Sequence, residues 1–420
     1  MCQCLTNLES RIPSPESMPM LNESRVQNPE SRTSPESRVP GPGLKRIMIV
    51  AGEASGDLHG ANVVKEALRL DEGLSFFGIG GVRMRDAGVE TLVDAAEMAV
   101  VGLVEVVSHF DVIYRAYSTL KSILAKNPPD LVILIDYPDF NLRVAKLAKR
   151  AGVKVLYYIS PQVWAWRVGR VKKIARLVDH MAVVFPFEVP FYEKEKVPVT
   201  FVGHPLLDVV HSSLSREEAL ASFDLDTGKR TVGLFPGSRR GEIKHLLPVI
   251  LDSAKLLRDR FPDLQFILPL AVSLDQTDIA PHLEKAGVAV KIVQGRGYDV
   301  MQACDAIITV SGTVTLETAL IGTPMVIIYR VSPLTYEIGR HLVRVEHIGL
   351  CNIVAGERVV QELVQHDCEP EKIAAEVGTI MTDPGYAAEM RQKLQMVKHR
   401  LGDGGCSKNV AGIITEMLKK

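Results

Sequence analysis

Two carboxylates, Asp136 and Asp139, follow directly on the most apolar run of the sequence. Residues 131–135 are five consecutive aliphatics between a proline pair and Pro138, a pattern that predicts a strand buried on both faces of a parallel sheet. Open α/β sheets bind ligands at the carboxyl ends of their strands, so Asp136 is aimed at a cleft. Both carboxylates could instead cap the next helix. We assign Asp136 to the chemistry and Asp139 to the helix cap.

A second candidate site follows the apolar residues 231–235, in the sequence Pro-Gly-Ser-Arg-Arg-Gly-Glu. Gly237 and Ser238 stand between an expected strand and an expected helix, where backbone N–H groups and the helix dipole can approach a phosphate. Arg239 can add bidentate contacts to a nucleotide diphosphate. The motif lacks the ending of a Walker A loop, and an ordinary glycine turn with solvated arginines is the alternative interpretation.

Ser311, Gly312 and Thr313 form a second turn of this kind, after the apolar residues 306–310. Their small side chains and open backbone at the start of an expected helix suit a phosphate. Glu317 lies one turn into that helix, where it could accept hydrogen bonds from ribose hydroxyls or simply be an acid favoured by the helix dipole. Two such turns in one half of the chain favour a nucleotide-diphosphate site.

The amino-terminal half has a matching turn, Gly-Glu-Ala-Ser-Gly-Asp, at residues 52–57. Its glycine spacing differs from the dinucleotide-binding fingerprint. We expect Glu53 to contact substrate hydroxyls and Asp57 to cap the helix that follows. In the loop-like residues 349–356, Asn352 could hold sugar hydroxyls or cap a following helix.

An apolar stripe runs through residues 98–110 and marks one face of an expected helix. The default interpretation is a core helix with a wide buried face. The alternative is an exposed patch that meets lipid tails or a membrane surface. The residues of this candidate patch are Val100, Val101, Leu103, Val104 and Val107.

The stretch 140–178 favours the membrane interpretation, because it holds ten lysines and arginines and no acid. Such a field attracts an anionic membrane by about 1 kcal/mol per nearby basic residue. The stretch also contains the only two tryptophans, Trp164 and Trp166, and interfacial aromatics beside cations suit a lipid headgroup. A buried tryptophan pair is the structural alternative. RNA binding ranks lower, because no RNA-binding motif is present.

Rigid elements must position these residues, and the hydrophobic pattern supplies two sets of them. Apolar runs of strand length alternate with helical patterns from residue 45 onward, which predicts doubly wound parallel sheets. The fold class is therefore α/β, with two Rossmann-like lobes facing a cleft. Strands are expected at 46–51, 75–79, 131–135, 153–159, 180–184 and 200–202, and again at 231–235, 265–269, 288–293, 306–310 and 325–329; the main helices are expected at 58–70, 142–151, 242–260, 313–321 and 385–401.

The length of 420 residues suggests two or three domains at about 150 residues each. The Pro- and Ser-rich start is too poor in aliphatics to fold and is expected to be disordered. The expected division is a disordered extension at 1–43, a first lobe at 44–207, a linker at 208–230, a second lobe at 231–384, and helices at 385–420 that cross back to the first lobe.

The composition excludes several classes of protein. A formal net charge of −1 and a pI near 6.8 argue against a dedicated nucleic-acid binder. The six cysteines show no metal-like spacing, which fits free thiols in a reducing cytoplasm. No apolar run approaches the ~20 residues needed to cross a bilayer.

Seven stretches together resemble a known family, the lipid-A-disaccharide synthases, which are two-lobed glycosyltransferases. They occur in family order from Lys45 to near the carboxyl terminus, and seven motifs in register are far more specific than one. They are Val-Ala-Gly-Glu-Ala-Ser-Gly-Asp at 50–57, Ala-Val-Val-Gly-Leu-Val-Glu-Val at 99–106, Ile-Asp-Tyr-Pro-Asp-Phe-Asn at 135–141, Ile-Ser-Pro-Gln-Val-Trp-Ala-Trp-Arg at 159–167, Pro-Gly-Ser-Arg at 236–239, Ser-Gly-Thr at 311–313 and Asn-Ile-Val-Ala-Gly at 352–356.

The resemblance implies transfer of 2,3-diacylglucosamine from UDP-2,3-diacylglucosamine to 2,3-diacylglucosamine 1-phosphate. The expected products are a β-1,6-linked disaccharide 1-phosphate and UDP, formed with inversion. The first lobe would bind the acceptor and the lipid chains, and the second lobe would bind the UDP-sugar. No metal and no cofactor are implied. The expected location is the cytoplasmic face of the inner membrane, with peripheral attachment, and a homodimer is left open.

The same resemblance assigns roles to individual residues. Asp136 matches the family's proposed base for the acceptor 6-hydroxyl, and Glu53 looks like an acid that orients the substrate. Arg239 matches the position that holds the diphosphate, and Glu317 resembles a ribose-binding acid. Two rival functions remain: a UDP-sugar 2-epimerase with the same two-lobed shape, and a non-catalytic protein that binds nucleotide sugars.

Overall fold

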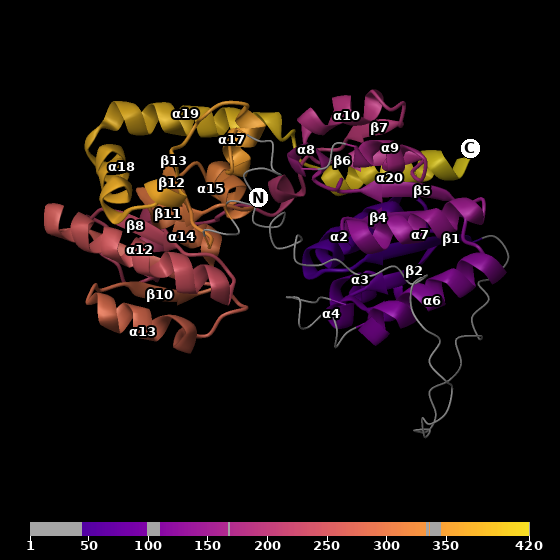
Figure 1. The fold of residues 1–420 in the computed structure, drawn as a ribbon, viewed down its shortest axis with the longest axis horizontal. Helices are drawn as coiled ribbons and strands as arrows, with labels where there is room; N and C mark the ends of the chain where they lie inside the picture. The colour runs from indigo at the N-terminus through magenta and orange to yellow at the C-terminus, as the bar shows by residue number, and fades with distance from the viewer. Residues whose placement is uncertain (1–43, 99–109, 167–168, 333–335, 337–345, 420) are drawn as a thin grey trace, which may run out of the picture.

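The computed structural model describes residues 44–98, 110–166, 169–332, 336 and 346–419. Figure 1 shows two lobes side by side, each built on one parallel sheet that helices cover. This confirms the predicted α/β architecture of two doubly wound lobes. Within the described residues, no helix has both the length and the apolar character needed to cross a membrane. The extension 1–43 lies outside the described residues.

The first lobe contains a seven-stranded sheet in the order β3-β2-β1-β4-β5-β6-β7. Its central strand β4 consists only of fully buried aliphatics, as expected for a strand covered on both faces. Its strands are β1 (Lys45–Ala51), β2 (Leu74–Gly80), β3 (Glu90–Asp94), β4 (Leu131–Ile135), β5 (Lys154–Tyr158), β6 (His180–Val183) and β7 (Val199–Phe201); its helices are α2 (Ala54–Leu70), α3 (Val82–Asp86), α4 (Ala95–Met98), α6 (Phe110–Lys126), α7 (Pro138–Arg150), α8 (Val163–Trp166), α9 (Arg170–Ala175) and α10 (Val189–Glu193).

The second lobe contains a six-stranded sheet in the order β10-β9-β8-β11-β12-β13, again parallel throughout. Its strands are β8 (Thr231–Phe235), β9 (Gln265–Leu270), β10 (Lys291–Gln294), β11 (Ala306–Val310), β12 (Met325–Tyr329) and β13 (Glu362–Val364); its helices are α12 (Arg240–Arg260), α13 (Gln276–Ala286), α14 (Gly297–Ala303), α15 (Val314–Ile321), α17 (Leu350–Ala355), α18 (Pro370–Thr382) and α19 (Pro384–Arg400).

The chain crosses between the lobes twice. The outward crossing runs from β7 through the 3₁₀ turn η3 (Pro205–Asp208) to α11 (Arg216–Ser222), which packs against α14 of the second lobe. The return crossing follows α19, and the last helix, α20 (Cys406–Lys419), packs on α2 of the first lobe (Figure 1). The carboxyl terminus therefore completes the first lobe.

Hydrogen bonds tie the two crossings to each other. The backbone N–H of His204 donates to the carbonyl of Leu401 at 2.9 Å. The backbone N–H of Gly405 donates to the Asp208 carboxylate at 2.7 Å. These bonds join the two crossings into one hydrogen-bonded unit.

The sequence did not predict two of the strands, and it mistook one helix for a loop. β3 is half-buried and β13 is only three residues long, so neither carries a strong apolar run. Residues 349–356, expected to be a loop, contain α17, and the helix expected from residue 58 begins at Ala54. Small residues in both stretches hid these first turns, since they also occur in loops.

The prediction that Asp57 caps the helix of residues 54–70 is wrong, because Asp57 binds the start of a different helix, α3. The Asp57 side chain lies inside the first turn of α2, is 6% exposed, and makes no cap for that helix. Its carboxylate instead accepts the backbone N–H groups of Gly81 at 2.6 Å, Met84 at 3.0 Å and Arg83 at 3.1 Å. Asp57 therefore holds the start of α3, which follows the neighbouring strand.

Asp139 does not cap its helix either. α7 begins at Pro138, with no side-chain hydrogen bond at its cap residue Tyr137, because a proline at the first position needs no acceptor for its missing N–H. The Asp139 carboxylate forms an ion pair with Arg170 at the start of α9. This pair links α7 to α9.

We predict that Asp57→Ala lowers the free energy of unfolding by about 3 kcal/mol, because three amides at the start of α3 lose a charged acceptor. Urea denaturation followed by circular dichroism measures the change. Asp71→Ala is the matched control: its exposed carboxylate accepts a single amide, that of Gly73, and the expected loss is within about 1 kcal/mol. Equal losses in the two variants would contradict the proposed role of Asp57.

Candidate active site

The loops after β1 and β4 meet at the point where the strand order of the first sheet reverses. These two strands are neighbours, and Ala51 at the end of β1 pairs with Ile135 at the end of β4. The next residues, Gly52 and Asp136, therefore leave the sheet side by side. Doubly wound sheets open a crevice at this switch point, and ligands bind there.

Asp136 and Tyr137 both have left-handed backbone conformations, with φ values of 46° and 45°. Residues with a side chain rarely adopt this conformation, and each instance costs roughly 1–2 kcal/mol. The surroundings hold it in place: the Asp136 carbonyl accepts the Tyr157 hydroxyl at 2.6 Å and the Asn141 amide at 2.7 Å. Strain that the surroundings enforce in this way is typical of functional sites.

The turn is also closely packed from the side of β1. A side-chain carbon added at Gly52 would lie 2.5 Å from the ring of Tyr137, so only glycine fits there. The Tyr137 ring in turn packs against Phe140, with ring centroids 5.9 Å apart. Position 52 therefore requires glycine, because the ring of Tyr137 occupies the space that a side chain there would need.

The Asp136 carboxyl group is half-buried and has a strongly shifted pKa. Burial raises the pKa of Asp136, the negative charge of Glu53 raises it further, and the backbone N–H of Tyr137 opposes the rise; the result is about 7. A carboxyl group with a pKa near the working pH can accept a proton from an alcohol and release it again.

Glu53 connects this group to the other lobe. Burial raises the pKa of the Glu53 carboxyl, and the guanidinium of Arg239 opposes that rise. Glu53 belongs to the first lobe and Arg239 to the second, so the two switch points lie within electrostatic reach of each other. Charge effects thus link three of the residues selected from the sequence, Asp136, Glu53 and Arg239.

The second lobe repeats the arrangement at β8 and β11. Phe235 at the end of β8 pairs with Thr309 near the end of β11, so the turns containing Gly237 and Gly312 are neighbours. Both glycines have positive φ, 102° and 149°, which residues with a side chain rarely adopt. The two candidate phosphate-binding turns therefore converge at the switch point of this sheet.

The groups within these turns differ in what they can offer a ligand. The Ser311 hydroxyl is buried and donates to the Ile348 carbonyl at 2.8 Å, whereas Thr313 is exposed at the start of α15. The backbone N–H groups of Ser238 and Arg239 already donate to the Glu242 carboxylate. Two of the backbone N–H groups that were expected to bind phosphate at residues 237–239 are therefore already bonded to Glu242.

Glu317 lies half-buried one turn into α15. One carboxylate oxygen accepts a long hydrogen bond of 3.5 Å from the Tyr298 hydroxyl. Burial raises the pKa of Glu317, and burial beside this carboxylate raises the pKa of Tyr298 to about 12. Tyr298 therefore remains a hydrogen-bond donor at neutral pH, and it orients Glu317 at the same edge of the sheet.

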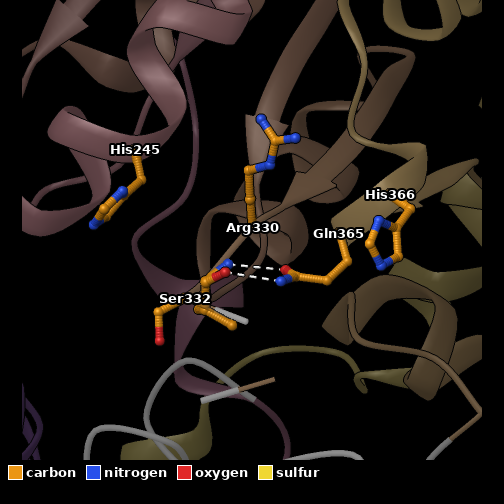
Figure 2. A pocket seen from close by; sticks show the side chains of 6 residues that line it. His245, Arg330, Ser332, Gln365 and His366 are labelled. Carbon is orange, nitrogen blue, oxygen red and sulfur yellow. Dashed lines mark hydrogen bonds between the residues drawn. The ribbon is translucent and has the colours of Figure 1, made fainter. Parts of the chain in front are cut away.

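A pocket of about 340 Å³ lies at the carboxyl ends of β12 and β13 (Figure 2). Its floor is fixed by the buried Gln365, whose carboxamide accepts the N–H of Val331 at 2.9 Å and donates to the carbonyl of Val331 at 2.8 Å. The sequence did not predict this pocket, although a signal was present: the polar residues Arg330 and Gln365 directly follow apolar strands. The lining residues are His245, Arg330, Val331, Ser332, Gln365 and His366.

The structure contradicts the expected role of Asn352. This side chain is fully buried inside α17, where no sugar can reach it, and it caps no following helix. Its oxygen accepts the N–H groups of Val359 and Val360 at 2.8 and 3.0 Å, and its nitrogen donates to Val360 and Glu362. Asn352 therefore binds α17 to the segment that leads into β13.

Trp164 is likewise buried rather than placed at a membrane surface, with 8% of its surface exposed. Its ring packs edge-on against Phe187 at 5.2 Å, and Leu350 and Ile353 of α17 complete the cluster. It thus joins α8 of the first lobe to α17 of the second, which lie close together in Figure 1. The side chain of Trp166 and the apolar patch Val100, Val101, Leu103, Val104 and Val107 lie outside the described residues.

Comparisons with known proteins agree on one family. A family model described as lipid-A-disaccharide synthetase matches residues 47–411. The lipid-A-disaccharide synthase of Geobacter metallireducens is 71% identical over 376 residues, which cover 90% of this chain and 98% of that protein.

Solved structures with a similar fold are much more distant in sequence. A putative UDP-N-acetylglucosamine 2-epimerase from Listeria monocytogenes has a TM-score of 0.62 at 12% identity, covering 90% of this chain and 97% of that one. The glycotransferase of kitacinnamycin has a TM-score of 0.56 at 15% identity, covering 90% and 100%. At such identities the likeness concerns the fold alone, so it gives no support to the epimerase alternative.

Proposed function

Because the chain belongs to the lipid-A-disaccharide synthase family and is therefore a glycosyltransferase, we propose that it transfers 2,3-diacylglucosamine from its UDP donor to 2,3-diacylglucosamine 1-phosphate. The products are the β-1,6-linked disaccharide 1-phosphate and UDP. The observation that carries the proposal is the family match over residues 47–411, together with the position of Asp136 beside the turn that contains Glu53 at the switch point of the first sheet.

Asp136 acts in this mechanism as the general base. Inversion at the anomeric carbon requires the acceptor hydroxyl to attack from the face opposite the leaving UDP, so base and leaving-group site belong on opposite sides of the sugar. The Asp136 carboxylate removes the proton of the acceptor 6-hydroxyl as the oxygen attacks. Glu53, beside it, orients the sugar hydroxyls and keeps the pKa of Asp136 high enough to take up that proton.

The second lobe stabilises the departing nucleotide. Negative charge grows on the diphosphate as the glycosidic bond breaks, and Arg239 together with the amino-terminal end of α15 at Thr313 lies at the turns where this charge develops. Glu317 accepts hydrogen bonds from the ribose hydroxyls. The pocket beside Gln365 adds binding surface for the donor at the same sheet edge. Arginine and helix dipoles supply the positive charge of this mechanism, which calls for no metal and no cofactor.

The basic surface of the first lobe supports peripheral attachment to the cytoplasmic face of an anionic membrane. α7 and α9, which the Asp139–Arg170 ion pair joins, expose Lys146, Arg150, Lys172 and Lys173. The field is weaker than the count of ten basic residues implied, because flanking acids neutralise Lys149 and Arg170. The exposed cations attract anionic headgroups and bring the lobe gap close to the lipid substrates.

We predict that Asp136→Asn lowers turnover by about 100-fold or more, since a positioned base contributes about that much, while UDP still binds. Chromatography of the disaccharide measures turnover, and calorimetry measures UDP binding. Asp139→Asn, three residues away and exposed, is the matched control and should retain turnover. Normal turnover in Asp136→Asn would remove Asp136 from the mechanism, and absence of disaccharide with the wild-type chain would refute the proposed transfer.

The rate should also depend on pH through Asp136. Only the ionised carboxylate accepts a proton, so kcat/KM should rise as pH increases through about 7. In Glu53→Gln a negative neighbour is lost, ionisation of Asp136 becomes easier, and the midpoint should move to lower pH. In Glu317→Gln, on the other lobe, the midpoint should stay in place. A midpoint that is unmoved in Glu53→Gln would show that Asp136 is not the titrating base.

For the membrane surface we predict that reversing Lys146, Arg150, Lys172 and Lys173 to glutamate weakens binding to vesicles containing phosphatidylglycerol by at least about tenfold. Sedimentation with vesicles measures the effect at fixed ionic strength. The control reverses four exposed cations of the second lobe, so that the change in net charge is the same: Lys285, Arg358, Arg391 and Lys398. Equal loss in both variants would show that net charge matters and that this surface does not.

A further inference from the structure

The turn after β8 is closed around a carboxylate of the protein. One oxygen of Glu242, in the first turn of α12, accepts the backbone N–H groups of Ser238 at 2.9 Å and Arg239 at 3.2 Å. These are the amides that a diphosphate would otherwise occupy at this helix start. The Glu242 side chain is only 14% exposed, so it is an integral part of the turn.

Gly237 shows that the turn is built for this carboxylate. Its φ of 102° favours glycine, and a side-chain carbon at this position would lie 2.2 Å from the Glu242 oxygen. Any larger residue would push the carboxylate off the two amides. The glycine that suggested a phosphate cradle in the sequence therefore makes room for Glu242.

The second oxygen of Glu242 holds the side chain of Arg239. The arginine Nη1 lies 3.4 Å from it, while 42% of the arginine side chain remains exposed. The same guanidinium lies within electrostatic reach of Glu53 on the opposite lobe. Arg239 is thus held to its own turn by one carboxylate, while a second carboxylate, Glu53 of the first lobe, lies within electrostatic reach.

We propose that Glu242 is a positioning residue that acts through Arg239. The Glu242 carboxylate accepts both amides of the turn, so these amides are not available to the leaving diphosphate. The diphosphate is bound instead by the guanidinium of Arg239 and by the turn at Thr313. This inference rests on the proposed glycosyl transfer. A plain capping box, in which the carboxylate only satisfies the helix start, is the structural alternative.

Glu242→Gln separates these two roles. The glutamine oxygen can still accept both amides, so the cap is kept, whereas its NH₂ group presents donors to a guanidinium that has only donors. Arg239 therefore loses its partner without loss of the turn. We expect kcat to fall by at least about 10-fold, because misplacement of a catalytic group by about 1 Å can cost more than that. UDP should bind more weakly, since Arg239 contacts its diphosphate, and the melting temperature should be unchanged.

A double-mutant cycle with Arg239→Ala gives the decisive measurement. If Glu242 acts through Arg239, Glu242→Gln should cause no further loss of kcat in the Arg239→Ala background. Glu218→Gln is the matched control, because Glu218 forms a capping box with Ser215 at the start of α11 and is paired with no arginine among the described residues. Its kcat should equal that of the wild type.

The outcomes distinguish the two proposals. If the wild-type chain forms disaccharide and Glu242→Gln costs the same factor with and without Arg239, or costs nothing at all, the positioning role is overturned and the transfer stands. If the wild-type chain binds UDP but forms no disaccharide, the transfer is overturned, and the positioning role with it.

Discussion

A carboxyl group at the end of a fully buried strand is the constraint on which the rest of this structure depends. β4 is aliphatic throughout and leaves the core at Asp136, where the chain must turn at once. The turn places a carboxylate beside Glu53, in surroundings that disfavour its charge, and the pKa of Asp136 rises to about 7. Desolvation and like-charge repulsion, which ordinarily oppose folding, here produce the reactivity that the proposed base needs.

The strained turn persists because several elements support it. Tyr157 of β5 and Asn141 of α7 both donate to the Asp136 carbonyl, and the ring of Tyr137 fills the space left by Gly52. Tyr157 and Asn141 belong to a strand and a helix of the first-lobe core, so these elements hold the backbone of Asp136. Rigid elements rather than mobile loops thus hold the proposed base.

The relation between the lobes depends on contacts that are far apart in the sequence. The two crossings are hydrogen-bonded to each other between His204 and Leu401, and Trp164 packs against Leu350 of the opposite lobe. Within the second lobe, Arg400 at the end of α19 donates to the Val354 carbonyl and so holds α17, the helix that Trp164 contacts. The crossings and Trp164 thus join residues of the two lobes that are far apart in the sequence.

The sequence predicted most of the strands and the residues at the switch points because both follow from local patterns. An apolar run fixes β4, and the rule for parallel sheets then directs Asp136 to the cleft. The partners of a polar side chain follow no such rule. Asp57 holds backbone 24 to 27 residues away, Trp164 meets residues of the other lobe, and Asn352 lies in a helix that its small neighbours concealed. Such pairings depend on tertiary contacts, and a single sequence does not record them.

The charges of Arg239, Glu242 and Glu53 explain why the nucleotide must be recognised by short-range hydrogen bonds rather than by net charge. Arg239 lies between Glu242 on its own turn and Glu53 across the gap, so these three groups sum to a negative charge when both acids are ionised. Net charge alone would then repel a diphosphate. Attraction must come from the exposed part of the guanidinium and from the oriented N–H groups at the start of α15, which act over short range. A site of this kind binds a diphosphate that is correctly placed and discriminates against one that is not. That selectivity suits an enzyme whose leaving group must lie on the side of the sugar opposite the base.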